Sequence, residues 1–231
     1  MIRDHDKVSP YNTFNEVTMG YKHVIWDWNG TLLNDIDLAV TVMQGMLADR
    51  AMPSMGVERY KDILTFPIRD YYEAVGFDFA THPFEELSDA FVEGYGRYFD
   101  MCGLQQGAKE TLEAVKAMGI GQSILTAGPQ EGVREQVVHF GIREYFETIT
   151  GDTDHHASGK IKLVKRHMDK INVEGKDCLF IGDTDHDVAV AEAIGCDCML
   201  VAFGHQARHI LEETGRPIAE NYGDVLAYMK G

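Results

Sequence analysis

Four polar side chains stand at or just beyond the ends of short apolar segments, where open α/β sheets place their chemistry. Two are carboxylates, one is a hydroxyl and one is an ammonium group: Asp27, Asp183, Thr126 and Lys160. These groups suit phosphoryl transfer, in which an aspartate attacks phosphorus and an aspartyl-phosphate forms. Carboxylates also hold Mg²⁺, while an ammonium and a hydroxyl can bind the phosphoryl oxygens. The sequence therefore predicts one magnesium and phosphate site built from these four residues.

The elements that would bring these residues together are strands and helices in alternation. Continuous apolar runs, typical of strands buried on both faces, occur at Val24–Trp26, Gln122–Thr126, Thr148–Thr150, Cys178–Ile181 and Cys198–Ala202. Helical patterns lie between them at Ala108–Met118, Gln130–Phe140, Lys160–Lys170 and Val188–Ile194. This order predicts an α/β fold with a doubly wound parallel sheet and right-handed crossovers. Because parallel strands end at the same edge, we expect folding to gather the four polar residues into one crevice.

One long stretch, residues 35–104, interrupts this alternation and contains no convincing strand. Apolar residues recur with helical spacing from Ile36 to Leu47, and further helical patterns follow at Val57–Leu64, Tyr71–Val75 and Phe84–Tyr98. We expect a small all-helical cap domain of residues 35–104 inserted into a core domain of residues 21–34 and 105–231. Since the insertion begins just beyond Asp27, it is predicted to be a lid that excludes water from the crevice.

Composition limits the classes of function and partner. The chain has 231 residues and a formal net charge of −16, which argues against nucleic acid or an anionic membrane as a partner. No apolar run approaches the roughly 20 residues of a membrane-spanning helix. Residues 1–20 are polar, which predicts a loosely ordered extension rather than a signal peptide. The four cysteines lack metal-finger spacing and are expected to be buried thiols in a cytoplasmic protein.

Four segments, in order, resemble the motifs of the haloacid dehalogenase (HAD) superfamily. They are Asp27-Trp28-Asn29-Gly30-Thr31-Leu32, Ile124-Leu125-Thr126, Ser158-Gly159-Lys160 and Gly182-Asp183-Thr184-Asp185-His186-Asp187. The first and fourth are specific, and the other two match by position. The inserted helices resemble that superfamily's type-1 cap, as in its phosphoglycolate-phosphatase-like members. The resemblance covers about residues 22–203 and implies a Rossmann-like core.

The resemblance also implies a role for each matched residue. Asp27 would be the nucleophile. The implied Mg²⁺ ligands are Asp27, the main-chain carbonyl of Asn29, Asp183 and Asp187, the last acting through water or by orienting Lys160. The implied phosphoryl-binding residues are Thr126, the neighbouring Ala127 and Lys160.

Asn29 departs from the pattern of the superfamily's phosphatases, which usually carry Asp at this position. That second Asp protonates the leaving group and later deprotonates the attacking water. Such help is worth about 10²–10⁴-fold, and an amide cannot give it. One interpretation is a phosphatase that is slow or restricted to good leaving groups, such as acyl phosphates. In another, His186, His205 or a cap residue supplies the proton.

Two further alternatives change the chemistry. Phosphonatases and dehalogenases of the superfamily also lack the second Asp. Dehalogenases, however, work without Mg²⁺ and do not need the Asp183 carboxylate. Phosphonatases need a cap lysine, and the only lysine among residues 35–104 is Lys61. The last alternative is a catalytically weak module that binds Mg²⁺ and phosphate for regulation, although such a module has little need of a nucleophile.

The cap is expected to select the substrate. Pro67 interrupts the helical pattern, which predicts a loop that carries Arg69, Tyr71 and Tyr72. Arg69 is a candidate clamp for a carboxylate or a second phosphate; the alternative is a salt bridge within the cap. A small cap over a closed crevice favours small phosphorylated metabolites as substrates. The protein is expected to be a monomer or a homodimer.

Overall fold

A six-stranded sheet forms the centre of the computed structural model, which describes residues 20–153 and 160–231. The strand order is β5-β4-β1-β6-β7-β8, and the neighbouring strands pair in parallel. The strands are β1 His23–Trp26, β4 Gly121–Pro129, β5 Thr148–Asp152, β6 Cys178–Gly182, β7 Asp197–Val201 and β8 Ile218–Ala219. The predicted doubly wound parallel sheet is confirmed. Residues 1–19 of the predicted N-terminal extension, together with Ser158 and Gly159, lie outside the described residues.

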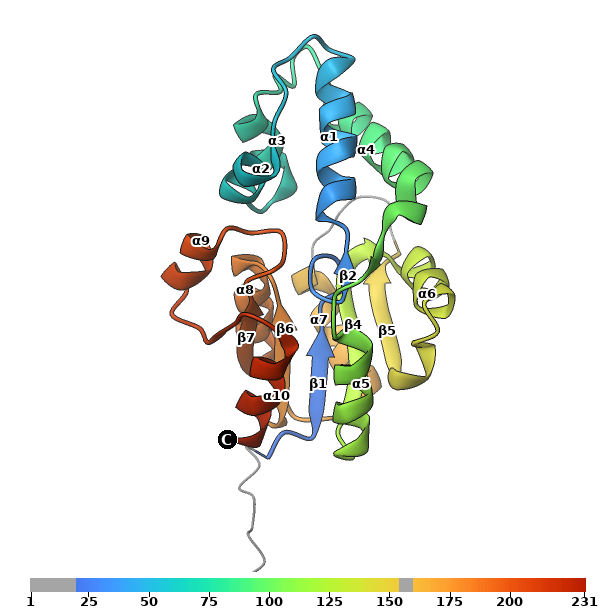
Figure 1. The fold of residues 1–231 in the computed structure, drawn as a ribbon, viewed down its shortest axis with the longest axis vertical. Helices are drawn as coiled ribbons and strands as arrows, with labels where there is room; N and C mark the ends of the chain where they lie inside the picture. The colour runs from blue at the N-terminus through green and yellow to red at the C-terminus, as the bar shows by residue number, and fades with distance from the viewer. Residues whose placement is uncertain (1–19, 154–159) are drawn as a thin grey trace, which may run out of the picture.

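Helices cover both faces of this sheet (Figure 1). On one face α5, α6 and α10 pack against alternate strand residues such as Val24 and Trp26. On the other face α7, α8 and α9 pack against Ile25 and its neighbours. These helices are α5 Ala108–Ala117, α6 Gln130–His139, α7 Lys160–Ile171, α8 Asp185–Ile194, α9 Arg208–Glu213 and α10 Tyr222–Lys230. Burial on both faces explains why the strand runs are apolar throughout rather than alternating.

Some elements differ from the prediction. Helix α8 begins at Asp185 rather than Val188, because Thr184 and Asp187 form a capping box that starts the helix earlier. Strand β4 continues to Pro129, beyond the apolar run. The pattern also missed β8, α9 and α10, which are short or only weakly periodic. Short 3₁₀ turns occupy Phe99–Met101, Arg143–Tyr145 and Gly175–Asp177.

The cap consists of α1 Ile36–Ala48, α2 Val57–Ile63, α3 Ile68–Val75 and α4 Phe84–Tyr98. It has its own apolar core, separate from the two cores of the sheet. Two short antiparallel strands, β2 Leu33–Asn34 and β3 Gly103–Leu104, connect it to the core (Figure 1). A strand at Gly103–Leu104 was not predicted, since two residues are too few to produce a periodic signal. No helix in the described ranges combines the length and the apolar composition needed to cross a membrane.

The prediction of a loop around Arg69 is wrong. Helix α3 starts at Ile68 with Pro67 as its N-cap residue, so Arg69, Tyr71 and Tyr72 are helical. Proline interrupts a helix only in its interior, and at the start its missing N–H costs nothing. Tyr71 and Tyr72 are buried in the apolar core of the cap.

Candidate active site

The register of the sheet places Asp27 and Asp183 next to each other. Trp26 of β1 pairs with Ile181 of β6, and the Asp27 amide donates to the Ile181 carbonyl at 2.8 Å. Asp27 and Asp183 follow these strands directly and are both buried. Lys160 is the first residue of α7, whose N-terminus reaches the same edge. The predicted convergence at the carboxyl edge therefore occurs for these three residues.

We call Asp27, Lys160, Asp183 and Asp187 the nucleophile cluster. The Lys160 ammonium lies 2.6 Å from an oxygen of Asp27 and 2.6 Å from an oxygen of Asp187. Each of the three carboxylates offers an oxygen, and these oxygens lie within 4.8 Å of one another. All four side chains are buried. Three carboxylates and one ammonium leave two excess negative charges away from water, an unfavourable arrangement without a further cation.

The pKa shifts in the nucleophile cluster follow from this crowding. Burial raises the pKa of Asp27; Lys160 opposes this effect, while the Asp187 and Asp183 carboxylates add to it. Burial also raises the pKa of Asp183. For Lys160, burial alone would lower the pKa, but Asp187 and Asp27 outweigh it and raise it. Asp27 and Asp183 are therefore hard to ionise. A divalent cation bound between them would favour the charged form of both carboxylates.

The donor set fits Mg²⁺. This ion prefers hard oxygen ligands and is usually held by one or two carboxylates together with water and phosphate oxygens. Asp27 and Asp183 provide such carboxylates, and the excess of two negative charges matches one divalent cation. The residues that would hold it are Asp27 and Asp183; the main-chain carbonyl of Asn29 as a further ligand stays a prediction.

Asp187 already has several partners. One oxygen accepts from Lys160, and the other accepts from the amides of Asp183 and Thr184 and from the Thr184 hydroxyl at 2.8–3.1 Å. These hydrogen bonds and Lys160 lower the pKa of Asp187 despite its burial. With its oxygens occupied in this way, Asp187 is suited to holding the Lys160 ammonium in place.

Asp183 is fixed by residues from two loops. Its oxygens accept from the Thr31 hydroxyl at 3.1 Å and from the His205 amide at 2.6 Å. The loops come so close that a Cβ on Gly30 would collide with Asp183 and His205, and a Cβ on Gly204 would collide with Asp183. Gly30 also has φ of 71°, a left-handed conformation that glycine adopts without strain. These glycines therefore allow the backbone to close around the Asp183 carboxylate.

Thr126 and Asn29 both lie beside Gly128, near the end of β4. Thr126 is buried near the end of the apolar part of β4, and its hydroxyl accepts from the Gly128 amide at 3.0 Å. A Cβ built on Gly128 would lie 3.4 Å from the Thr126 hydroxyl and 3.5 Å from Asn29 Oδ1. The Asn29 oxygen and the Thr126 hydroxyl thus face a common space beside Gly128. Ala127, between Thr126 and Gly128 in sequence, is exposed.

A second cluster, buried except for the partly exposed Asn29 and Tyr95, surrounds the Asn29 side chain and joins the core to the cap; we call it the hinge cluster. It contains Asn29, Asp35, Tyr60, Tyr95 and His205. One Asp35 oxygen accepts from the Gly30 amide at 2.8 Å and pairs with His205 Nε2 at 3.0 Å. The other accepts from Asn29 Nδ2 at 2.8 Å and from the Tyr95 hydroxyl at 2.6 Å. Each oxygen of this carboxylate therefore has two partners.

The hinge cluster balances its own charge. Burial alone would lower the pKa of His205, but Asp35 outweighs it and raises the pKa to about 9. Burial alone would raise the pKa of Asp35, but His205 and the hydrogen bonds outweigh it and lower the pKa. The pair is therefore an imidazolium and a carboxylate at neutral pH. His205 Nδ1 also bonds the Tyr60 hydroxyl at 2.8 Å, which ties the cap helix α2 to the core.

The cap contacts the core at further points on this side. The Ala207 amide donates to the Lys61 carbonyl at 3.0 Å, and the Gln206 side chain donates to the Leu64 carbonyl at 3.0 Å. His186, a predicted candidate for proton donation, stacks on Phe66 of the cap with 4.9 Å between ring centroids. These contacts hold α2 and the segment after it against the start of α8 and the loop that follows β7.

Arg69 is engaged elsewhere. Its guanidinium lies 4.2 Å from the ring centroid of Phe79 and 5.3 Å from that of Phe84, both in the cap. Neither the predicted substrate clamp nor the alternative salt bridge describes this contact, which is a cation–π interaction. A role in substrate binding stays a prediction.

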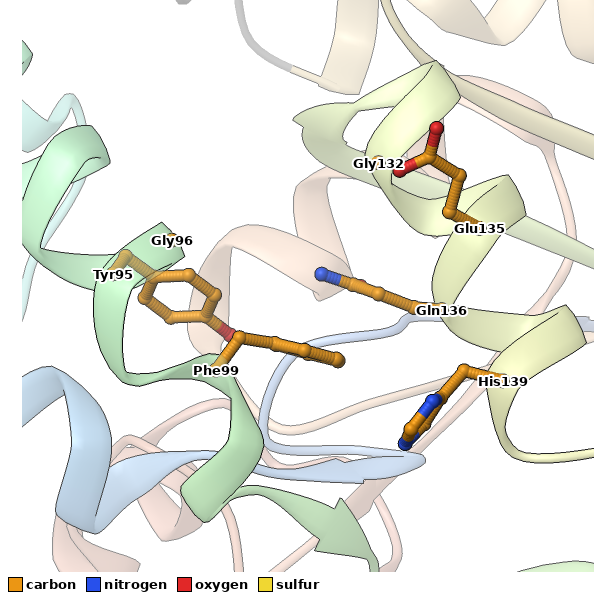
Figure 2. A pocket seen from close by; sticks show the side chains of 7 residues that line it. All are labelled: Tyr95, Gly96, Phe99, Gly132, Glu135, Gln136 and His139. Carbon is orange, nitrogen blue, oxygen red and sulfur yellow. The ribbon is translucent and has the colours of Figure 1, made fainter.

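A pocket of about 340 Å³ lies between α4 of the cap and α6 of the core (Figure 2). Tyr95 and Phe99 face Gly132 and Gln136 across it, and Gln136 extends from α6 toward the two aromatic rings. The Gln136 oxygen accepts from the indole of Trp28 at 2.7 Å. Tyr95 thus has its ring in the wall of the pocket and its hydroxyl in the hinge cluster.

Several residues of the site were not predicted from the sequence. Thr31 and Thr184 lie within the motifs but have no predicted role in the site beyond a helix cap for Thr184, and His205 is predicted only as a proton donor. The segment Gly204-His205-Gln206 follows shortly after an apolar strand run, so the strand-end argument could have identified it as part of the site. Asp35 and Tyr95 give no such signal, because only the docking of the cap brings them to Asn29.

Comparisons with known proteins agree with this fold and this edge of the sheet. Residues 24–201 match the model of a family described as haloacid dehalogenase-like hydrolase. Phosphoglycolate phosphatase 1 of Pseudomonas aeruginosa is 26% identical over 211 residues, covering 88% of this chain and 78% of that protein. A 5'-nucleotidase of the same organism is 26% identical over 196 residues, covering 82% of this chain and 86% of that protein.

Solved structures give the same result for the fold. A haloacid dehalogenase-like family hydrolase from Streptococcus pneumoniae superposes with a TM-score of 0.76 at 18% identity, covering 91% of this chain and 99% of that one. The family model covers most of the core, including β1 and its Asp27, and the interval that contains the cap. The chain therefore belongs to the haloacid dehalogenase-like hydrolase family.

Proposed function

We propose that this protein is a Mg²⁺-dependent phosphatase that acts on a small phosphorylated metabolite through an aspartyl-phosphate on Asp27. The observation that carries the proposal is the buried convergence of Asp27, Lys160 and Asp183 at the carboxyl edge of the sheet. The names of the relatives, a phosphoglycolate phosphatase and a 5'-nucleotidase, support a phosphomonoester as the substrate.

In the first step, an Asp27 oxygen attacks phosphorus. A bond forms between this oxygen and phosphorus, and the bond from phosphorus to the leaving oxygen breaks with its electron pair. Lys160, which lies 2.6 Å from Asp27, is placed to hold a phosphoryl oxygen, and Asp187 holds Lys160. The Thr126 hydroxyl is a second candidate for this role. When bound to Asp27, Asp183 and the Asn29 carbonyl, Mg²⁺ would neutralise charge on the phosphoryl oxygens.

Asn29 limits the reaction. Its amide cannot protonate a leaving oxygen, so the first step lacks help that is worth about 10²–10⁴-fold. Turnover is therefore slow, or restricted to substrates whose leaving group needs no proton. Ala127 and Arg69 stay candidates for substrate contacts.

A C–halogen hydrolase is a weaker alternative, because such enzymes need no cation and would gain nothing from a second buried carboxylate at Asp183. A phosphonatase would need Lys61 at the reaction centre. Its backbone bonds Ala207 at the edge of the cap, and nothing in this contact favours a catalytic lysine.

The test is a screen of small phosphate esters, anhydrides and acyl phosphates, with and without Mg²⁺. We expect release of phosphate that requires Mg²⁺, with the highest rates for good leaving groups. Turnover of a haloacid or a phosphonate alone, or binding of phosphate without any turnover, would contradict the proposal.

A further inference from the structure

The orientation of the Asn29 amide is fixed by its neighbours. A primary amide has a donor side, its nitrogen, and an acceptor side, its oxygen. The nitrogen of Asn29 lies 2.8 Å from an Asp35 oxygen and 2.9 Å from the Tyr95 hydroxyl oxygen. Exchanging the two ends would put the amide oxygen against a carboxylate, where it would find no hydrogen to accept from Asp35. The nitrogen therefore stays on the side of Asp35.

Asp35 is itself held firmly enough to impose this orientation. It is buried, and the Gly30 amide and His205 occupy its other oxygen. The Tyr95 hydroxyl donates its hydrogen to Asp35 at 2.6 Å, so toward Asn29 the same hydroxyl is an acceptor. Both partners of the Asn29 nitrogen thus accept, and a flipped amide would lose its bond to Asp35, while Tyr95 could donate to it only by releasing Asp35.

The acceptor side of Asn29 consequently points away from Asp35, toward Gly128 near the end of β4. Its oxygen and the Thr126 hydroxyl would lie 3.5 and 3.4 Å from a Cβ built on Gly128. Asn29 is also only two residues from Asp27. The side chain therefore offers a fixed hydrogen-bond acceptor, and no donor in its preferred orientation, to a group bound beside Gly128 and Thr126.

We propose that Asp35 and Tyr95 are positioning residues that hold the Asn29 oxygen toward the water that hydrolyses the aspartyl-phosphate. The inference rests on the proposed function and deepens it by assigning a role to each face of Asn29. On this proposal, Asn29, which stands where the superfamily's phosphatases usually carry Asp, serves the second step. The first step proceeds without a proton donor at this position.

The second step balances without an acid. The water oxygen bonds to phosphorus, the bond between phosphorus and the Asp27 oxygen breaks, and its electron pair returns to the carboxylate. One water proton passes to a phosphate oxygen, so the products are the Asp27 carboxylate and a monoanionic phosphate. The carboxylate is a good leaving group, and an acceptor that orients the water is the help that this step can use.

The same geometry names the substrate class. In the first step the leaving oxygen departs beside an acceptor, which cannot stabilise it. Substrates whose leaving group is stable as an anion are therefore favoured: acyl phosphates, phosphoanhydrides and aryl phosphates rather than alkyl phosphates.

The arrangement also makes the second step depend on the cap. Tyr95 belongs to α4, and its ring forms one wall of the pocket between α4 and α6 (Figure 2). If α4 moves away from α6, the Tyr95 hydroxyl leaves the Asn29 nitrogen and the amide loses one of its two fixed partners. Hydrolysis of the intermediate is then supported only while the cap is docked as described.

The experiment separates the two steps by rapid quench with p-nitrophenyl phosphate and Mg²⁺. It compares the wild type with Asp35→Asn and Tyr95→Phe, each of which alters one partner of the amide. Matched controls are Asp37→Asn and Tyr98→Phe, exposed residues on α1 and α4. We expect dephosphorylation to slow about 10–100-fold in Asp35→Asn and less in Tyr95→Phe. Release of the first p-nitrophenol should change less than about 3-fold, which gives a burst and a fall in kcat at nearly constant kcat/KM.

Each outcome decides the question. A purely structural role would slow both steps together, and this result, or no change in either step, would overturn the inference while leaving the proposed function intact. Absence of any phosphoenzyme in a wild type that releases phosphate would instead refute the proposed function. If Asp35→Asn does not fold, as judged by thermal unfolding, Tyr95→Phe decides alone, since it removes only one oxygen atom.

Discussion

The nucleophile cluster and the hinge cluster are neighbours built on buried carboxylates, yet they differ in charge balance. In the nucleophile cluster three carboxylates share one ammonium, whereas in the hinge cluster the single carboxylate of Asp35 has four partners, one of them the His205 imidazolium. The first cluster is incomplete without a cation and the second is complete as it stands. Buried charge left uncompensated marks a place for a ligand, and buried charge that is fully paired marks a structural or positioning role.

The two clusters also differ in origin. The ends of two strands and the first turns of two helices of the core supply the whole nucleophile cluster, so it can form whether or not the cap is docked. The hinge cluster needs Tyr60 from α2, Tyr95 from α4 and His205 from the loop after β7. The first is therefore suited to the chemistry, and the second to coupling that chemistry to the position of the cap.

The largest effect is expected from Asp27→Asn. The variant keeps the size of the side chain but removes the nucleophile, so turnover should fall by about 10⁴-fold or more. Phosphate release measures it, with Asp37→Asn as the control for loss of one carboxylate at an exposed position. Activity near the wild-type level in Asp27→Asn would mean that this cluster is not the reaction centre.

Binding of Mg²⁺ should raise the thermal stability of the fold through the nucleophile cluster and not through the hinge cluster. At about 100 times its Kd the ion stabilises the fold by about 2.7 kcal/mol, which for a chain of this size raises Tm by roughly 5–10 °C. We expect Asp183→Asn to abolish this shift and Asp35→Asn to preserve it, as measured by thermal unfolding with and without Mg²⁺. An equal loss in both variants would show that the clusters do not act separately.

Exchanging the carboxylate and the amide tests the hinge cluster from within. Asn29→Asp alone would place a second carboxylate at hydrogen-bond distance from Asp35, where both cannot ionise freely. Combining it with Asp35→Asn keeps one carboxylate and one amide. We expect the double variant to gain about 10–100-fold on an alkyl phosphate, since an acid now stands at position 29. The single variant should gain less, and an equal gain in both would mean that Asp35 does not control position 29.

The smallest expected effect is the pH dependence of the hinge cluster. The pKa of His205 is raised from its ordinary value to about 9, so its pairing stabilises the fold fully below about pH 6.5 and ceases to do so as the pH rises through about 9. Between pH 7 and 8 the loss should be about 1 kcal/mol. Denaturant unfolding of the wild type and His205→Gln measures it. The free energy of unfolding of His205→Gln should change less with pH over this range. A slope equal to that of the wild type would contradict the ion pair.

The same contrast explains what could be predicted from the sequence. Asp27, Thr126, Lys160 and Asp183 each follow from a local pattern, because a parallel sheet brings strand ends together regardless of what the cap does. Asp35, Tyr60, Tyr95 and His205 meet only through the docking of cap helices on core loops. The sequence therefore placed Asn29 in the site but left open what fixes its orientation.

Arg69 illustrates a second limit. Pro67 was interpreted as a helix breaker, and the same residue begins α3. A proline that ends one pattern and one that starts the next give the same local signal. The aromatic rings that contact Arg69 belong to Phe79 and Phe84, well beyond the loop predicted after Pro67.

The most direct test of the nucleophile cluster is the location of a covalent intermediate. Protein mixed with Mg²⁺ and p-nitrophenyl phosphate is quenched in acid, digested and mapped by peptide mass spectrometry. We expect one phosphoryl group on Asp27, removable by hydroxylamine as an acyl phosphate should be, and absent without Mg²⁺. Release of phosphate with no phosphoryl group on Asp27 at any time, or with the group on another residue, would contradict the assignment.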